Sequence, residues 1–257
     1  MFGKRKKQDK IPCYVLVFDQ IDIIRKSLDF LVRFTDKLDI IVIENPSPNT
    51  PKIRNIIDTL GHNKLLKQYY LFEKNITNNA YDIVLSKDIS KIRKHNYVMF
   101  TDGDLTCDND NWLTEETGIL EYNNDVFACG ISLEKSNLPL KSFPDAKNWI
   151  PKDIDEKDDY FEAFTGGHLL LFRGKEFASF LEWKKLNKQV FIDSVMHKYC
   201  HENLSKKWAR TKHAEAYHHT WDLYKYKDNP YTKLKIKKGF ENTWKHNDTA
   251  NYVLKNY

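Results

Sequence analysis

The first hundred residues alternate between short apolar runs and segments with helical spacing, and this alternation restricts the fold more than any other feature of the chain. The apolar runs predict four strands, at residues 12–18, 39–44, 69–71 and 97–101. The intervening segments predict three helices, at residues 21–32, 51–60 and 80–92. Nearly continuous apolar strands that alternate with helices are typical of parallel pairing. We therefore expect an α/β fold with a mostly parallel central sheet and helices on both faces.

The second half of the chain is less regular. Its pattern predicts strands at residues 126–132 and 167–172 and helices at residues 176–186 and 191–200. Residues 138–159 are rich in Pro, Lys and Asp and predict a long loop, which in a compact domain is usually functional or disordered. We find no internal repeat and no low-complexity linker, so we expect one domain.

The net charge of the chain comes mainly from its N-terminus. The chain carries 41 Lys and Arg against 36 Asp and Glu, and the opening MFGKRKKQDK holds five of these bases and one acid. The nearly neutral remainder excludes a basic folded face for nucleic acid. No apolar stretch approaches the roughly 18 residues of a membrane span, and the four cysteines form no disulfide framework. We expect a cytoplasmic location, with the basic segments at either end available for peripheral membrane contact.

The apolar run at residues 97–101 leads directly into two carboxylates, Asp102 and Asp104, with Gly103 between them. Carboxylate oxygens are the ligands that Mg²⁺ and Mn²⁺ prefer, and such ions usually share their coordination shell with substrate phosphates. Ligands of parallel sheets bind beyond the carboxyl ends of the strands, where this motif lies. The alternative is an Asp-Gly turn without a ligand.

At these two aspartates the chain resembles the metal-dependent GT-A glycosyltransferases, particularly the family-2-like type, over most of residues 11–221. Asp19 follows a segment similar to the family's first strand. Glu44 and Asn45 resemble its second-strand signature, usually Asp-Asn-x-Ser, whose acid contacts the nucleobase. The resemblance implies that Asp102 and Asp104 match the D-x-D motif, which binds the metal and the sugar-nucleotide diphosphate.

The resemblance continues in the second half. Gly166 and Gly167 lie where the family has a small-residue turn beside the donor sugar, although a simple bend at a strand start explains them equally well. Asp193 matches the family's general base, while Ile192 replaces the usual preceding Glu. A helix N-cap is the alternative role for Asp193. His218 matches the histidine that ends the family's closing strand and that ligates the metal or touches the diphosphate.

The resemblance implies a single GT-A-like, Rossmann-related domain at residues 11–221, with a nucleotide-binding half at 11–106 and an acceptor half at 107–221. A basic flexible tail (1–10) would precede it, and a Lys/aromatic-rich extension (222–257) would follow. The implied activity is metal-dependent transfer of a sugar from a UDP- or GDP-type nucleoside-diphosphate donor. The implied cofactor is Mn²⁺ or Mg²⁺, and the acceptor would be a hydroxyl of a glycan or lipid.

Three alternatives stay open. Asp102-Gly-Asp104-Leu-Thr106 also fits the D-x-D-x-T motif of haloacid-dehalogenase-type phosphatases, with the first Asp as nucleophile, although that motif normally ends a first strand. Asp158 and Asp159 would then supply a second metal pair. His197, Cys200 and His201 could form a zinc site, but no fourth ligand has suitable spacing. The C-terminal lysines and aromatic residues also suit a non-catalytic module that binds a polyanion or a membrane surface.

Overall fold

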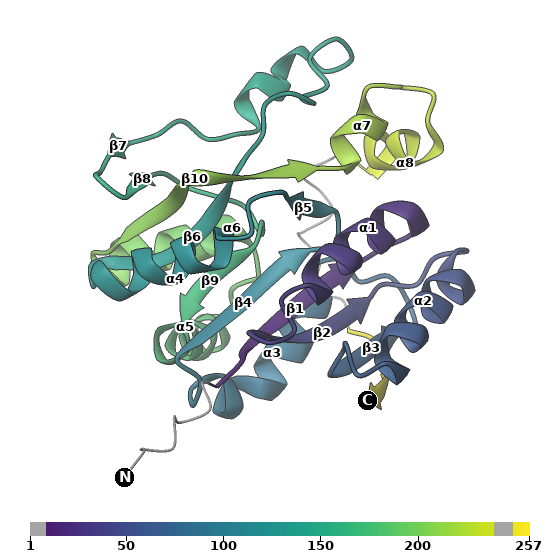
Figure 1. Ribbon diagram of the computed structural model, residues 1–257, viewed down its shortest axis with the longest axis horizontal. Helices are drawn as coiled ribbons and strands as arrows, with labels where there is room; N and C mark the ends of the chain where they lie inside the picture. The colour runs from purple at the N-terminus through teal and green to yellow at the C-terminus, as the bar shows by residue number, and fades with distance from the viewer. Residues whose placement is uncertain (1–8, 239–248) are drawn as a thin grey trace.

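The computed structural model describes residues 9–238 and 249–257 (Figure 1). Most of the predicted basic tail and part of the C-terminal extension lie outside the described residues. Within the described part, the strands join in one sheet with the order β11-β3-β2-β1-β4-β9-β6-β10-β8-β7, and β5 pairs with β10. The predicted α/β fold class is confirmed.

The first half consists of the predicted strand–helix units. In chain order these are β1 (Ile11–Val17), α1 (Ile21–Val32), β2 (Leu38–Glu44), α2 (Thr50–His62), β3 (Gln68–Phe72), α3 (Asn79–Ile92) and β4 (Tyr97–Asp102). The pairs β1–β2, β2–β3 and β1–β4 are all parallel. In register, Val17 lies opposite Glu44 and Leu16 lies opposite Asp102, so the carboxyl ends of these strands are level.

The second half extends the sheet with mixed pairing. Its elements are β5 (Leu105–Cys107), α4 (Trp112–Tyr122), β6 (Val126–Leu133), β9 (Leu170–Arg173), α5 (Gly174–Leu186), α6 (Asp193–Lys198), a π-helical turn (Tyr199–Asn203) and β10 (Lys207–His218). β9 runs antiparallel to both β4 and β6, whereas β10 runs parallel to β6. The sequence did not predict α4 or β5. The strand expected at residues 167–172 begins only at Leu170, because Leu169 has a positive φ of 45° and breaks the extended conformation.

The predicted loop at residues 138–159 is mostly irregular. It contains one 3₁₀ turn (Pro144–Asn148) and the two-residue strand β7 (Asp155–Glu156), which pairs with β8 (Tyr160–Glu162). In the view of Figure 1 this segment projects above the sheet.

The predicted C-terminal extension packs against the domain at two places. The short helices α7 (Thr220–Tyr224) and α8 (Pro230–Lys238) lie beyond the carboxyl ends of β1 and β4 (Figure 1). The last strand, β11 (Tyr252–Asn256), pairs antiparallel with β3 at the sheet edge.

The hydrophobic core has two parts, one on each face of the sheet. Along β1, Cys13, Val15 and Val17 belong to the core under α1, α2 and α4, whereas Tyr14 belongs to the core under α3 and α5. This alternation follows from the two-residue period of a strand. Both faces are therefore covered by helices, as the apolar strands predicted. No helix among the described residues is long and apolar enough to cross a bilayer.

Candidate functional site

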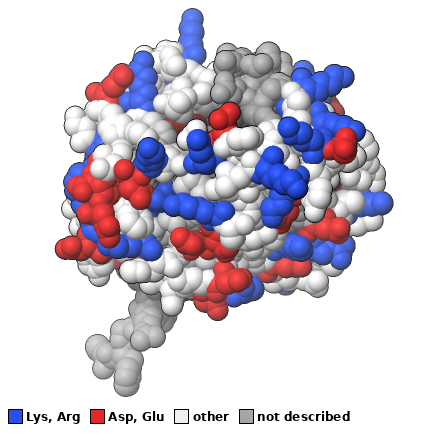
Figure 2. Space-filling view, turned by 90° about the horizontal axis from the view of Figure 1, so that it is seen from above, with Lys and Arg blue, Asp and Glu red and all other residues white. Residues whose placement is uncertain are grey.

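A cavity of about 650 Å³ lies at the carboxyl ends of β1 and β4. The first half of the chain, the loop around Trp149, the Gly166–Gly167 turn, α6, the end of β10 and both C-terminal helices all contribute to its walls. Figure 2 views the molecule from this end and shows both basic and acidic side chains spread over the face. Of the residues predicted for the site, the lining includes Asn45, Asp102, Asp104, Gly166, Gly167, Asp193 and His218.

The backbone of Gly103 holds the two aspartates against β1. Its N–H donates to the carbonyl of Leu16 over 2.7 Å. A Cβ at this position would lie 2.6 Å from Val17 Cγ1 and 2.9 Å from Leu16 O, which is too close for any other residue type. Glycine is thus required for packing against the first strand, and this packing fixes the direction in which Asp102 and Asp104 leave the sheet.

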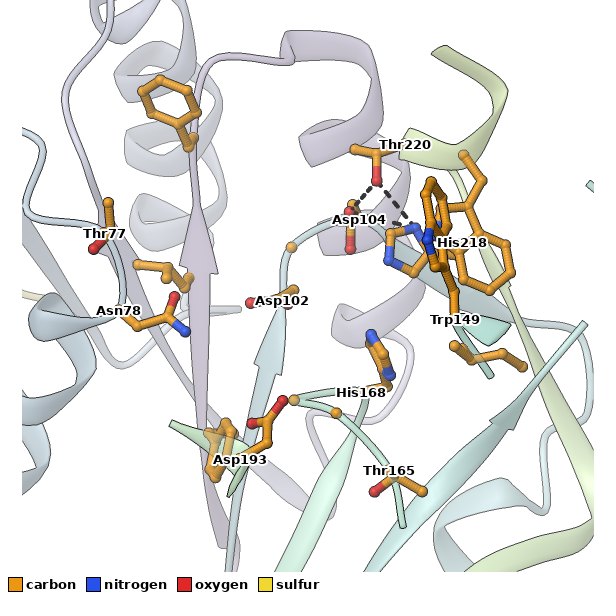
Figure 3. Close-up of a pocket in the computed structure, with 18 of the residues that line it drawn as sticks. Thr77, Asn78, Asp102, Asp104, Trp149, Thr165, His168, Asp193, His218 and Thr220 are labelled. Atoms are coloured by element: carbon orange, nitrogen blue, oxygen red, sulfur yellow. Dashed lines mark hydrogen bonds and ion pairs between the residues drawn. The ribbon is translucent and has the colours of Figure 1, made fainter. Parts of the chain in front are cut away.

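Asp104 and His218 are joined through Thr220 (Figure 3). The Thr220 hydroxyl donates to Asp104 Oδ2 over 2.7 Å and lies 3.0 Å from His218 Nδ1. Because the hydroxyl has one hydrogen, which goes to the carboxylate, its oxygen accepts the Nδ1–H of His218. The ring then presents its other nitrogen as a lone-pair donor. His218 also stacks on Trp221, with ring centroids 4.6 Å apart and planes at 6°.

The residues around Asp104 fit a divalent cation in part. In residues 9–238 and 249–257 no three His, Cys, Asp or Glu side chains are grouped closely enough to hold a metal ion, so the predicted set Asp102, Asp104 and His218 is not a complete cage. Asp104 Oδ1, however, is buried and has no hydrogen-bond donor within the described chain. Mg²⁺ and related ions commonly take one or two carboxylates and complete their shell with substrate phosphates and water. An incomplete protein shell with an unused buried oxygen suits that arrangement.

Asp102 lies next to the glycine turn. Its N–H donates to Gly167 O over 3.0 Å. Burial, together with the charges of Asp104 and Asp193, raises the pKa of Asp102 well above its usual range, while Lys235 acts in the opposite direction. A Cβ added at Gly167 would lie 3.2 Å from the Phe100 ring, so the turn passes close to the end of β4.

Asp193 is the first residue of α6 and lines the same cavity (Figure 3). The N-cap of this helix is Ile192, so the alternative that Asp193 is the N-cap is wrong. Burial raises the pKa of Asp193 to about 7. A carboxyl group with that pKa is suited to take up a proton near neutral pH.

Asn45 braces the loop that precedes α3. Its side-chain amide donates to Thr77 O over 3.0 Å, and its carbonyl oxygen accepts the Ile76 N–H over 3.0 Å. Thr77 and Asn78 then line the cavity on the side opposite Asp104 and His218, as Figure 3 shows.

Asp19 and Glu44 do not line the cavity. Glu44 is fully buried under the β2–α2 connection, where its carboxylate accepts hydrogen bonds from Thr50 (2.7 Å) and from the Tyr69 hydroxyl. Asp19 has a positive φ of 65°, and its carboxylate accepts the side-chain amides of Gln20 (2.7 Å) and of Asn49 (3.2 Å). Both acids stabilise the loops beside the site.

Several lining residues were not predicted from the sequence. His168 directly follows the predicted glycine pair, and Thr220 follows His218 by two positions, so proximity in sequence could have suggested both. Burial and the neighbouring His218 lower the pKa of His168 to about 3. Trp149, Arg210 and Lys235 reach the cavity only through the tertiary fold, and no local pattern indicated them.

The competing sites predicted from the sequence do not assemble. His197 packs against Phe164 and makes an edge-to-face contact with Trp208, while Cys200 Sγ donates to the carbonyl of Lys206, so the zinc alternative is wrong for the described residues. Asp158 and Asp159, the second metal pair of the phosphatase alternative, do not line the cavity.

No protein-family profile matches the chain. Its similarity at the sequence level is to proteins of Acanthamoeba polyphaga mimivirus. Uncharacterized protein L142 is 41% identical over 99% of this chain and 52% of its own length. Uncharacterized protein L137 is 41% identical over 95% of this chain and 34% of its own length. The chain thus spans about half the length, or less, of the curated relatives it matches.

Two solved structures resemble the fold at low sequence identity. The first is the mannosyltransferase PcManGT from Pyrobaculum calidifontis in complex with GDP-Man and Mn²⁺, with a TM-score of 0.55 and 16% identity over 89% of this chain and 60% of that one. The second is GalNAc-T7 with UDP, GalNAc and Mn²⁺, with a TM-score of 0.57 and 8% identity over 81% of this chain and 43% of that one. The chain has a glycosyltransferase-like fold of the GT-A, Rossmann-related kind.

Proposed function

We propose that the chain is a divalent-metal-dependent glycosyltransferase that moves a sugar from a UDP- or GDP-type donor to a hydroxyl acceptor. The observation that carries this proposal is the unpartnered, buried Oδ1 of Asp104 beside His218, at the carboxyl end of β4. Other residues of the cavity support the proposal. The side-chain amides of Asn45 and Asn78 line the same cavity, and so does the carboxyl group of Asp193. The domain at residues 11–221 would carry the transfer, with α8 completing the wall of the cavity.

Asp104 and His218 would hold Mn²⁺ or Mg²⁺, with Asp102 beside them. When bound, such an ion neutralises the charge of the departing diphosphate. Thr220 orients both ligands, since it donates to the carboxylate and accepts from the imidazole. Lys235, which lines the cavity and partly opposes the rise in the pKa of Asp102, would add positive charge on the diphosphate side.

The donor sugar would lie in the cavity against the glycine turn and Asp193, which are close to each other. A Cβ at Gly166 would come within 3.3 Å of Asp193 Oδ2, so any side chain at this position would intrude between the turn and the carboxyl group. Asp193 would take the proton of the acceptor hydroxyl, which predicts inversion at the anomeric carbon. With a pKa of about 7, a large fraction of Asp193 is ionised at neutral pH.

A thermal-shift panel of UDP, GDP, CDP and dTDP, each with and without Mn²⁺, tests the proposal. A ligand at a hundredfold excess over its dissociation constant stabilises the native state by about 2.7 kcal/mol. We expect a metal-dependent rise in Tm with one nucleotide, and loss of that rise in Asp104→Asn. Asp108→Asn is the matched control, because Asp108 is exposed four residues further on and does not line the cavity. A metal-dependent rise that persists in Asp104→Asn contradicts the proposed metal site.

A further inference from the structure

Two buried nitrogen atoms in the cavity have no role in the chemistry described above. His197 Nε2 and Arg210 Nε are both buried without a hydrogen-bond partner among the described residues. Both side chains line the cavity. A buried polar atom without a partner is costly in a folded protein, and inside a cavity such atoms mark where a ligand atom binds.

His197 is held rigidly. Its ring lies 4.1 Å from the ring of Phe164 and 4.2 Å from that of Trp208, between centroids. A hydrogen bond to the Thr165 backbone raises its pKa, whereas burial lowers the pKa overall, to about 4. The neutral ring therefore donates one N–H to the loop, and the lone pair of Nε2, buried at the wall of the cavity, has no donor among the described residues.

Arg210 supplies the complementary donor. The residue is only 7% exposed, and its two terminal nitrogens donate to Asp153 and to the carbonyl of Pro151. The ion pair with Asp153 fixes the guanidinium plane and compensates its charge. The Nε–H remains as a single, oriented donor. Trp208 and Arg210 are two residues apart on β10, so they lie on the same face of the strand, and Trp208 contacts His197.

The position of His197 relative to Asp193 determines what such a ligand can be. The two residues are four positions apart in α6, so their side chains share one face of the helix, about one turn apart. A molecule whose hydroxyl reaches Asp193 therefore places its neighbouring atoms next to His197. The Nε2 acceptor requires a second hydroxyl on that molecule, and the Arg210 Nε–H requires an oxygen.

We propose that His197 and Arg210 form an acceptor subsite for a polyhydroxylated sugar ring, in which one hydroxyl faces Asp193 and a second donates to His197 Nε2. This proposal rests on the transferase function proposed above and specifies its acceptor. Aromatic side chains at the cavity, among them Phe164, Trp149 and Trp221, supply the flat apolar surfaces that the C–H faces of a sugar ring contact. A lipid-phosphate acceptor would leave His197 Nε2 without a donor, so the observations favour a carbohydrate.

The subsite can be tested without turnover, by saturation-transfer NMR of methyl α-glycosides of mannose, glucose and galactose with the full chain. We expect at least one of them to bind in the absence of a nucleotide. His197→Phe retains the ring between Phe164 and Trp208 but removes Nε2, together with the N–H that bonds the Thr165 backbone, so we expect about tenfold weaker binding. His201→Phe is the matched control, because His201 is exposed, contacts Phe164 edge-on at 5.4 Å and does not line the cavity.

Deoxy analogues of the bound glycoside give a second measurement on the unaltered protein. Removal of the hydroxyl that faces His197 should weaken binding to the wild type by the same factor as His197→Phe. The deoxy analogue should bind to His197→Phe no more weakly than the parent glycoside does. This arm remains informative if His197→Phe does not fold.

Absence of binding for all three glycosides, or equal binding by His197→Phe and wild type, overturns the subsite. Binding of decyl phosphate in their place also overturns it, in favour of a lipid acceptor. The transferase proposal fails separately, if no nucleotide shifts Tm with Mn²⁺ while glycoside binding still depends on His197.

Discussion

His218 Nδ1 lies 3.6 Å from Asp104 Oδ2, and the Thr220 hydroxyl bridges the two groups. The bridge joins the end of β4 to the start of α7 across more than a hundred residues of chain. It fixes the tautomer of the imidazole and occupies one oxygen of the carboxylate. Under the proposed function, the remaining lone pairs, on His218 Nε2 and Asp104 Oδ1, would bind the metal ion.

Thr220→Val removes this bridge with little change in volume. We expect Mn²⁺-dependent nucleotide binding to weaken by about tenfold to a hundredfold, the usual cost of losing a group that orients metal ligands. A Mn²⁺ titration followed by Tm in the presence of the preferred nucleotide measures the change. Thr106→Val is the control, since Thr106 makes an equivalent 3.0 Å hydrogen bond to the neighbouring His219 but does not line the cavity. Equal losses in both variants would show that the effect is general destabilisation.

Gly103→Ala should destabilise the fold through a steric clash with β1. The new Cβ would lie 2.6 Å from Val17 Cγ1 and 2.9 Å from a backbone oxygen, which cannot move away easily. Overpacking of this kind costs about 1–3 kcal/mol, measurable by urea unfolding. Gly118→Ala is the contrasting change, because Gly118 lies inside α4 with no atom within 4 Å of its added Cβ. The free energy of unfolding of that variant should increase by about 0.5–1 kcal/mol. An increase for both variants would refute the packing role of Gly103.

The pattern of apolar runs predicted the four parallel strands, because buried strands between helices leave a signal that requires no tertiary information. α4 escaped prediction because its sequence places Thr114, Thr117 and Gly118, which are weak helix formers, between asparagines. Its helix forms because Trp112 and Leu120 are buried against the sheet. The helix therefore depends on tertiary packing more than on local propensity.

In the candidate site, too, some residues could be predicted from local sequence and others could not. Asp102 and Asp104 were predictable because a strand end and two acids are adjacent in sequence. Glu44 has equally favourable surroundings in sequence, yet it turns under α2 because Thr50 and Tyr69 offer it hydrogen bonds. Arg210 on β10 and Lys235 on α8 line the cavity, and no pattern in the neighbouring sequence predicts this.

Asp193 should make stability depend on pH. Burial raises the pKa of Asp193 in the folded state to about 7 from an ordinary value of 3.8, so between these two pH values the native state holds a proton that the unfolded state has released. Stability from this group is complete below about pH 4 and is lost as pH rises through about 7. Asp193→Asn removes this dependence, and we expect its stability relative to wild type to increase by about 1–3 kcal/mol between about pH 5 and about pH 8. Urea unfolding of both proteins at about pH 5 and about pH 8 measures this change. A difference in stability that does not vary with pH would contradict the raised pKa of Asp193.

Glu116 offers a prediction about stability alone. The residue is fully buried in α4, and neither carboxylate oxygen has a hydrogen-bond partner among the described residues. Burial raises the pKa of Glu116 well above its usual range, and the nearby charge of Glu115 adds to the shift. Glu116→Met has similar length and removes the desolvated carboxyl group, so we expect a gain of about 1–3 kcal/mol at neutral pH. Urea unfolding of Glu116→Met beside wild type measures the gain, with nucleotide binding expected to stay unchanged because Glu116 does not line the cavity. A loss of stability would mean that the carboxyl group binds a buried water or a partner that its surroundings require.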